Sequence, residues 1–242
     1  MTSEEKVGLL LEKNEIKIWY GQVKGEDSFY QSYWHVLDDA EKNQANKMHS
    51  PLLHKRYVEI HGRTRQLLSK TLNLAPEKIT IKKAEHGKPY LVDYPELAFN
   101  LSHSAEKMMM AFAWNCRIGV DIEIIKQRVN VIGLVKKCFG VEEITYWNQL
   151  PDTEKNQVFY RFWTRKEAFV KATGGGILLG LNHCVINPEN PKEFLRIPNQ
   201  CGKPSEWHLQ DIDLDGGVCS AIVTDKLFTD IKLIGLKDEV GI

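Results

Sequence analysis

Two carboxylates stand two positions apart in the segment RIGVDIEII, residues 117–125. Successive side chains of a β-strand project from opposite faces, so Asp121 and Glu123 would share one face of this segment. The other face would carry aliphatic side chains, those of Ile118, Val120, Ile122 and Ile124. The points at which the two acidic side chains leave the backbone would lie about 7 Å apart, close enough for both carboxylates to reach one cation. A solvated strand face explains the same pair, so this segment alone does not decide between the two interpretations.

A third acidic candidate occurs in FWTRKEAFVKATGGGI, residues 162–177. Glu167 and Lys171 are four positions apart and would lie on one side of a helix. The apolar side of this helix would carry Phe159, Phe162, Trp163, Phe169 and Val170. By itself, this pattern also fits an ordinary surface Glu–Lys pair. The three glycines that follow are either a helix C-cap with a flexible link or a place where the backbone approaches a ligand or partner.

Taken together, the two segments indicate chemistry on a phosphorylated substrate. Three carboxylates without clustered His or Cys favour a hard cation, Mg²⁺ or Mn²⁺, over zinc. Magnesium usually keeps coordination positions for water and substrate phosphates, and a lysine beside it can neutralise charge on a phosphoryl group.

The elements that would position these residues follow from the periodicity of the sequence. Helices are predicted over 52–72, 131–139, 142–150 and 154–173, with helical segments around a break in 30–48. Strands are predicted over 15–23, 78–84, 98–104, 107–115, 117–125, 183–188, 206–212, 218–224 and 231–236. The Gly- and Pro-containing segment 85–97 is predicted to be a loop.

Composition excludes several other classes of function. The 242 residues carry 32 basic and 32 acidic side chains, so neither a general nucleic-acid binder nor a membrane-surface binder is indicated. Five scattered cysteines indicate reduced thiols rather than a disulfide framework. The first 13 residues contain too short an apolar run for a signal peptide, so a cytoplasmic location is expected.

The quoted motifs resemble those of the 4′-phosphopantetheinyl transferase superfamily. GVDIE at 119–123 and the segment 162–177 resemble its signature pair, and GKPYL followed by FNLSHS resembles the upstream motif of its Sfp-like branch. The resemblance covers about residues 86–177. It implies transfer of phosphopantetheine from coenzyme A to a serine of an apo acyl or peptidyl carrier protein, with release of 3′,5′-ADP.

The resemblance also implies roles for individual residues. Asp121, Glu123 and Glu167 match the metal-binding acids, for Mg²⁺ or possible Mn²⁺. Lys171 matches the lysine that faces the pyrophosphate, and we interpret it as a charge stabiliser and Glu167 as the candidate base. The positions expected to contact coenzyme A are Lys42, Arg56, Lys88, Ser102, His103 and Lys171.

The fold implied is α+β, with two similar halves forming a pseudo-dimer. Each half would pack a small antiparallel sheet against a long helix, with coenzyme A in the cleft between them. Residues 1–116 would form the nucleotide side, and residues 117–242 the magnesium site and carrier-docking side. A monomer is expected.

A docking surface for an acidic carrier is expected around Lys136, Lys137 and Phe139. A surface amphipathic helix explains these residues as well. The family often has a basic residue between its glycines and another after the D-x-E acid, whereas this chain has GGG and Ile124 there.

Other functions remain alternatives at this stage. A magnesium-dependent nuclease would need a basic groove, which the balanced charge does not suggest. A non-catalytic protein that binds coenzyme A or a carrier would be indicated by loss of one acid, and all three are present. A serine hydrolase is disfavoured because Ser102 and His103 are adjacent on a strand and would point to opposite faces. The sequence leaves open which carrier is modified, whether acyl-coenzyme A is accepted, which group is the general base and which of the two metals is used.

Overall fold

The computed structural model describes residues 11–127, 131–214 and 217–236. Residues 1–10 lie outside the described residues. They include most of the N-terminal segment that was considered as a signal peptide. The helices are α2 (Tyr30–Val36), α3 (Asp39–Asn46), α4 (Pro51–Leu72), α5 (Val131–Cys138), α6 (Val141–Gln149) and α7 (Asp152–Thr173). Short 3₁₀ turns connect several elements, among them η3 (Ile177–Leu179), η4 (Leu181–His183) and η6 (Pro204–Glu206).

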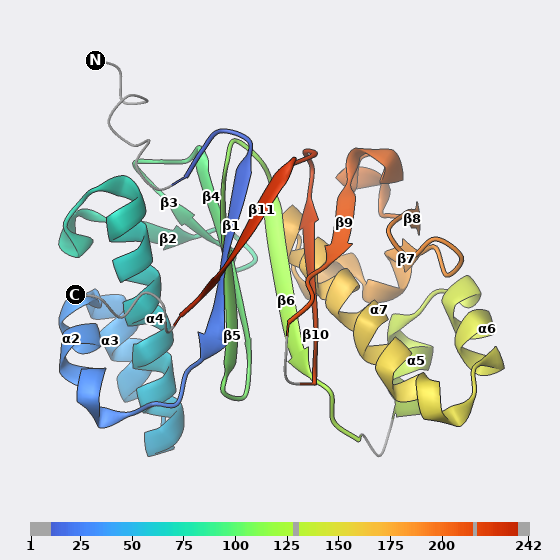
Figure 1. The fold of residues 1–242 in the computed structure, drawn as a ribbon, viewed down its shortest axis with the longest axis horizontal. Coiled ribbons are helices and arrows are strands. Elements are labelled where there is room, and N and C mark those ends of the chain that lie inside the picture. The colour runs from blue at the N-terminus through green and yellow to red at the C-terminus, as the bar shows by residue number, and fades with distance from the viewer. Residues whose placement is uncertain (1–10, 128–130, 215–216, 237–242) are drawn as a thin grey trace.

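The strands form two main sheets that face each other in the centre of the molecule (Figure 1). The first sheet has the order β11-β1-β5-β4, with β1 (Glu15–Gln22), β4 (Leu97–Ser104), β5 (Lys107–Trp114) and β11 (Asp230–Gly235). The second sheet has the order β6-β10-β9, with β6 (Ile118–Ile124), β9 (His208–Asp211) and β10 (Val218–Thr224). Two hairpins pair β2 (Ile81–Lys83) with β3 (Pro89–Leu91), and β7 (Val185–Ile186) with β8 (Phe194–Arg196).

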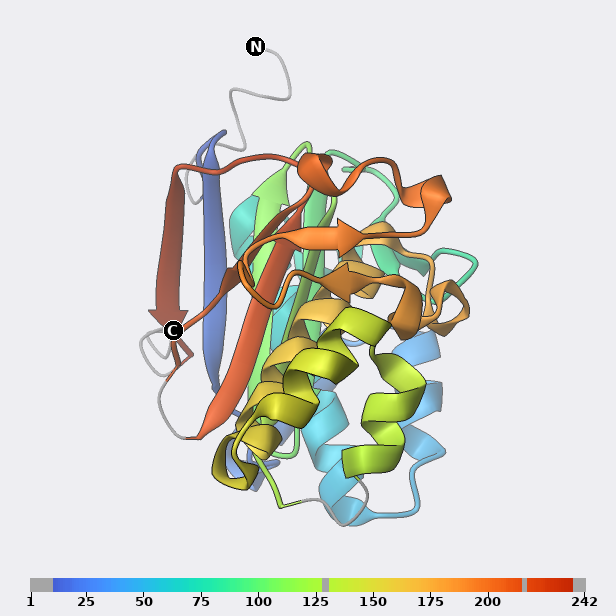
Figure 2. The ribbon, with the colours of Figure 1, turned by 90° about the vertical axis from the view of Figure 1, so that its right-hand side faces the viewer.

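The main elements are stacked in four layers: α4, the first sheet, the second sheet and α7. The core between α4 and the first sheet includes Leu68, Met110 and Phe112, and the core between the two sheets includes Ile18 and Val120. Aromatic side chains of α7 fill a third core with α5, α6 and the second sheet. Figure 2 shows the ribbon from the side of these helices. Burial on both faces explains the near-continuous apolar run in β5.

The two 22-residue helices begin and end as their sequences indicate. Ser50 caps α4 through a hydrogen bond from the Leu53 amide, and Pro51 is the first helical residue, where its missing amide proton costs nothing. The left-handed Gly174 ends α7, and its amide donates to the Val170 carbonyl.

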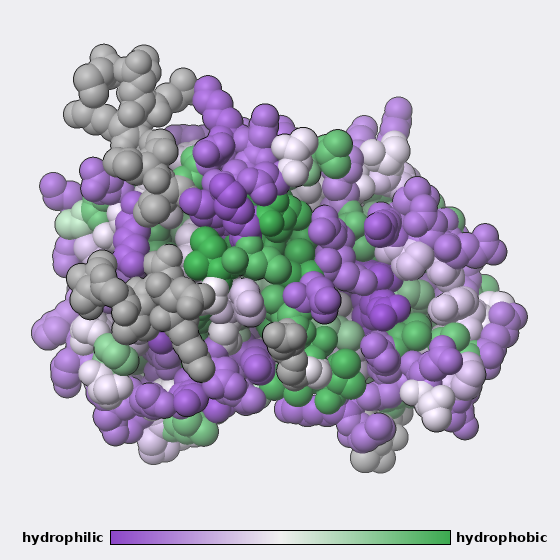
Figure 3. Space-filling view, viewed as in Figure 1, coloured by the Kyte–Doolittle hydropathy of each residue, from purple (hydrophilic) through white to green (hydrophobic). Residues whose placement is uncertain are grey.

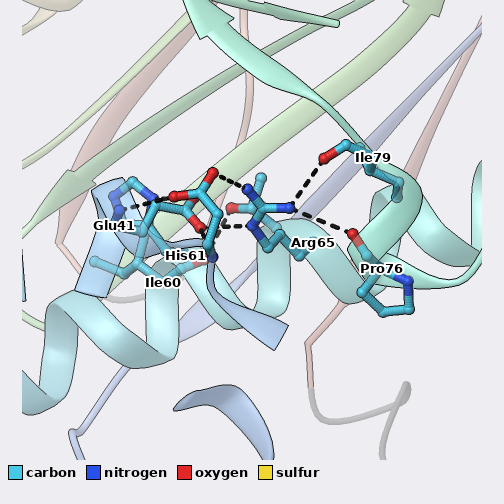
Figure 4. A network of polar contacts seen from close by, with 8 residues as sticks. Glu41, Ile60, His61, Arg65, Pro76 and Ile79 are labelled. Carbon is cyan, nitrogen blue, oxygen red and sulfur yellow. Dashed lines mark hydrogen bonds and ion pairs between the residues drawn. The ribbon is translucent and has the colours of Figure 1, made fainter. Parts of the chain in front are cut away.

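A buried arginine ties α4 to the elements around it (Figure 4). The Arg65 side chain, 2% exposed, donates to Glu41 at 2.5 Å and also to Asp38, the acidic residues of the capping box that starts α3. The same guanidinium reaches the Ile79 carbonyl at 3.1 Å, just before β2. His61 contacts the other oxygen of Glu41 at 3.2 Å. These bonds fix α3 against α4.

Most predicted elements are confirmed, and the mixed α+β class is confirmed with them. Two short strands were not predicted: β3 lies inside the expected loop 85–97, and β8 has no period-2 signal over its three residues. The expectation of purely antiparallel sheets is wrong for the first sheet, because β11 pairs with β1 in parallel. The last strand thus joins the sheet that contains the first strand.

One face of the molecule exposes hydrophobic side chains where the two sheets meet, as Figure 3 shows. A cavity of about 700 Å³ opens there, lined by Ile16 and Ile231 of the first sheet and Leu209 and Ile222 of the second. None of the predicted site residues lines it. No helix within the described ranges is both long enough and apolar enough to cross a membrane.

Candidate active site

The strand β6 presents Asp121 to helix α7 rather than to solvent. At Gly119, an added Cβ would lie 2.0 Å from the Ala168 carbonyl oxygen and 2.3 Å from the Ala172 amide nitrogen, so strand and helix are in backbone contact there. The Asp121 residue is only 4% exposed as a result. The alternative of a fully solvated strand face is therefore wrong for Asp121.

Lys171 of α7 and Ser102 of β4 converge on Asp121. The Lys171 ammonium group donates to Asp121 Oδ1 at 2.7 Å and to the Ser102 hydroxyl oxygen at 2.8 Å. The Ser102 hydroxyl donates to the same Asp121 oxygen at 2.8 Å. A buried carboxylate is costly without a partner, and these two donors compensate for the burial of Asp121.

Glu123 is partly buried on the same strand face, and the Ser104 hydroxyl of β4 donates to its Oε2 at 2.7 Å. Ser102 and Ser104 are two positions apart, as are Asp121 and Glu123. The two strands therefore match hydroxyl to carboxylate along their length.

Glu167 completes a group of acids that influence one another. Burial raises the pKa of the Glu167 carboxyl. The negative charge of Asp121 raises this pKa further, Lys171 acts in the opposite direction, and Glu123 adds a smaller upward effect. The three acids predicted from the sequence therefore share one electrostatic environment.

The fit of this site to a metal ion depends on its oxygen atoms. As arranged, no group of three His, Cys, Asp or Glu in the described part of the chain is ready to hold an ion. However, Asp121 Oδ2 is buried without a hydrogen-bond partner, an arrangement that needs an explanation. An oxygen-seeking cation would satisfy this atom and reduce the repulsion between the three acids. The donor set fits Mg²⁺ or Mn²⁺ in its chemistry.

Lys88 lies beside the acids but is engaged by the backbone. Its amine donates to the carbonyls of Ile118 at 3.0 Å and Ala172 at 2.8 Å, joining the end of the β2–β3 turn to β6 and α7. Burial lowers the pKa of Lys88 to about 8. Lys88, Glu167 and Lys171 also line a cavity of about 270 Å³ at the end of α7.

The three glycines after α7 serve as a cap and as a contact surface. Gly174 and Gly176 both have positive φ, 72° and 62°, which side chains rarely adopt. A Cβ on Gly174 would meet the Lys88 side chain at 3.4 Å, and one on Gly176 would meet His86 at 3.0 Å. The C-cap interpretation is therefore confirmed, and the β2–β3 turn packs against the segment. Approach of this backbone to a ligand or partner stays a prediction.

The nucleotide candidates of the first half lie on three elements. His103 is an exposed residue of β4, and its pKa is lowered by partial desolvation and by the positive charges of Lys171 and His61. Arg56 of α4 has a buried Nε atom without a hydrogen-bond partner, and its guanidinium lies 4.0 Å from Glu106. Lys42 is partly exposed on α3. The structure thus brings His103 near the acids. Within the described part of the chain, Arg56 and Lys42 form neither a hydrogen bond nor an ion pair with these acids.

The predicted docking surface needs one correction. Lys136 and Lys137 are exposed at the end of α5, next to Ile132, which is 60% exposed. Phe139 is 2% exposed and packs against Phe159 and Phe162 of α7. Its side chain therefore belongs to the core and cannot form part of a docking surface in this conformation.

A fully buried ion pair near the site was not anticipated from the sequence. The Lys166 amine donates to Glu143 Oε2 at 2.6 Å and to the carbonyls of Cys138 and Leu181, at 3.0 and 2.9 Å. Glu143 also accepts from the amides of Gly140 and Ile186. The pair holds α5, α6 and η4 against α7 directly beside Glu167. The only sequence signal for this ion pair is the spacing of Gly140 and Glu143, which is that of a capping box.

Comparisons with known proteins agree with this geometry. The family model described as "4'-phosphopantetheinyl transferase superfamily" matches residues 117–223. The chain is 29% identical over 218 residues to the 4′-phosphopantetheinyl transferase HetI of Nostoc sp., covering 88% of this chain and 89% of the relative. It is 31% identical over 179 residues to a putative 4′-phosphopantetheinyl transferase of Synechocystis sp., covering 73% and 72%. A third relative, the 4′-phosphopantetheinyl transferase ffp of Bacillus subtilis, is 34% identical over 118 residues, 49% of this chain and 51% of its own length. The chain belongs to the 4′-phosphopantetheinyl transferase superfamily.

Proposed function

We propose that this protein transfers the phosphopantetheine group of coenzyme A to a serine of an apo acyl or peptidyl carrier protein. The observation that carries the proposal is the convergence of Asp121, Lys171 and Glu167 between β6 and α7, on the two segments that resemble the family signature. A nuclease or a non-catalytic binding protein explains this geometry and the family membership less well.

The resemblance to the family implies a divalent cation, Mg²⁺ or Mn²⁺. Asp121, Glu123 and Glu167 would hold this ion. When bound, such an ion neutralises charge on the pyrophosphate and on the departing phosphate. Lys171 is partly exposed and pairs with Asp121, which supports the proposed binding of a phosphate oxygen by its ammonium group.

Glu167 is the proposed base. Its raised pKa makes the carboxylate a stronger base than an exposed glutamate, suited to accept the proton of the carrier serine. The serine oxygen then forms a bond to the β-phosphorus of coenzyme A. The bond from that phosphorus to the oxygen bridging to the adenylate breaks, and 3′,5′-ADP leaves with the bridging oxygen.

Residues 1–116 are the proposed nucleotide side and residues 117–242 the proposed metal and docking side. The orphaned donor of Arg56 supports a contact of this residue with an anionic ligand. Lys42, Lys88, Ser102 and His103 complete the proposed coenzyme A set. Because Lys88 and Ser102 already bond within the protein, their proposed role is to shape the site.

The pairing of a small sheet with a 22-residue helix in each half supports the pseudo-dimer proposal, with one chain acting as a monomer. Exposed Lys136 and Lys137 support docking of an acidic carrier on α5.

The proposal is tested by chromatographic detection of 3′,5′-ADP after incubation with coenzyme A, Mg²⁺ and an apo carrier. A carrier whose acceptor serine is replaced by alanine serves as the control. Release that depends on the serine supports the transferase. Binding of coenzyme A without release, across several carriers, would favour the non-catalytic alternative.

A further inference from the structure

Strands β4 and β6 lie side by side but belong to different sheets. No backbone ladder joins them within the described residues, although they are in close contact along their length. Three side chains at alternate positions of β4 face β6 instead: Asn100, Ser102 and Ser104. The contact between the two halves of the molecule is therefore made by polar side chains at this point.

These side chains replace the carbonyl groups of a neighbouring strand. The Val120 amide donates to Asn100 Oδ1 at 2.9 Å, and the Ile124 amide donates to the Ser104 hydroxyl oxygen at 3.3 Å. Both amides flank the acidic pair of β6. Since buried amides need acceptors, Asn100 and Ser104 fix the position of β6 along β4.

Ser104 also determines how Glu123 is oriented. While its oxygen accepts from the Ile124 amide, its proton is free to be donated, and it is donated to Glu123 Oε2 at 2.7 Å. The hydroxyl therefore binds one residue of β6 as acceptor and its neighbour as donor. This bond holds one carboxylate oxygen toward β4 and restricts rotation of the whole side chain.

We propose that Ser104 is a positioning residue for Glu123, which orients this carboxylate for the divalent cation used in transfer. The inference rests on the proposed function in so far as it concerns catalysis. Unlike Ser102, Ser104 does not touch Asp121 or Lys171 in any described contact. Loss of a hydrogen-bonding partner behind a ligand typically costs about 10- to 100-fold in metal affinity or activity.

The test is calorimetric titration of Mn²⁺ into the full-length protein saturated with coenzyme A, for the wild type, Ser104→Ala and Ser104→Thr. The exposed serine of η6 supplies a matched control, Ser205→Ala. Glu123→Gln gives the value for complete loss of the carboxylate. Transfer to a carrier is measured in parallel over a range of metal concentrations, so that maximal rate and metal requirement are separated.

We expect the dissociation constant for Mn²⁺ to rise about 10-fold or more in Ser104→Ala and to return toward the wild-type value in Ser104→Thr. High metal should restore most of the maximal rate in Ser104→Ala, and Ser205→Ala should match the wild type. A wild-type dissociation constant in Ser104→Ala would overturn the positioning role. Absence of transfer by the wild type, together with the expected change in Mn²⁺ binding, would instead refute the proposed function and leave the positioning of Glu123 intact.

Discussion

At the scale of single residues, the site combines one buried acid, Asp121, and two partly buried acids, Glu123 and Glu167, with the ammonium group of Lys171. Asp121 is nearly inaccessible, and its nearest charge is Lys171 at 2.7 Å. Glu167 has no described salt bridge, and burial with two neighbouring acids raises its pKa. This difference supports the proposed roles: charge pairing and metal binding for Asp121, and proton transfer in addition to metal binding for Glu167.

Glu167→Gln tests the proposed base. The amide preserves the size of the side chain but can neither accept the serine proton nor bind a hard cation as a carboxylate does. We expect transfer to fall by about 10²- to 10⁴-fold or more, with an unchanged circular dichroism spectrum and melting temperature near that of the wild type. Wild-type turnover in this variant would remove Glu167 from the mechanism.

Lys88 makes stability depend on pH. Its pKa is about 8 in the fold against a usual value of 10.5, so between these values the unfolded chain binds a proton that the folded chain does not. Stability should therefore rise with pH across this window. Because other groups titrate there too, the quantity to measure is the difference between the wild type and Lys88→Met in urea denaturation at pH 7.5 and 9.5.

We expect the wild type to gain on the order of 1 to 2 kcal/mol relative to Lys88→Met over this interval. Parallel curves for the two proteins would mean that the Lys88 amine keeps an ordinary pKa in the fold.

At the scale of elements, α7 is held in place by a pair that carries no net charge. Lys166 and Glu143 are both 0% exposed, and every proton of the Lys166 amine has an acceptor. Removing one partner of such a pair leaves an unpaired charge in the core. This pair therefore couples the placement of α5 and α6 to the helix that carries Glu167.

Lys166→Met should destabilise the protein by about 3 to 5 kcal/mol, since Glu143 would be left buried without its cation. The double variant Lys166→Met, Glu143→Gln should recover part of this loss, because glutamine keeps an oxygen for the Gly140 and Ile186 amides. Denaturant titration of the wild type, Lys166→Met, Glu143→Gln and the double variant measures the coupling. Losses of stability in the two single variants that add up to the loss in the double variant would show that the charges are not coupled.

Predictability also differs between elements and residues. Helices α4 and α7 were predicted closely because caps and apolar periodicity agree along them. The three acids were predicted as site residues from spacing and residue type, and the structure brings them into one electrostatic environment. Ser104 was not identified, although the alternation of FNLSHS places it on the same face as Ser102, because the sequence does not show that β6 lies opposite. Phe139 was misassigned because an amphipathic helix pattern does not show which side meets a neighbouring helix.

At the scale of the whole molecule, the two halves are joined by shared layers. The core between the sheets takes Ile16 and Ile18 from β1 and Val120 and Ile222 from β6 and β10. The chain also returns at its end to add β11 beside β1. Alternation predicts that 231–236 is a strand, but it contains no information about the partner, so this crossing could not be predicted.

This arrangement implies that the first half does not fold alone. A fragment of residues 1–116 lacks β6, β10 and β11, which leaves one face of its sheet and the edge of β1 uncovered. We expect this fragment to show no cooperative thermal transition by calorimetry, whereas the full chain unfolds in a single transition. A cooperative transition in the fragment would show that the halves are independent domains.

The most direct test of the central claim is intact-mass spectrometry of an apo carrier protein incubated with this protein and coenzyme A. Parallel samples contain Mg²⁺ or EDTA, and fatty-acid, polyketide and peptide carriers are all tried. We expect a gain equal to one phosphopantetheine group in the presence of Mg²⁺ and none with EDTA. An unchanged mass for every carrier, while coenzyme A still binds, would contradict the assignment of this site to phosphopantetheine transfer.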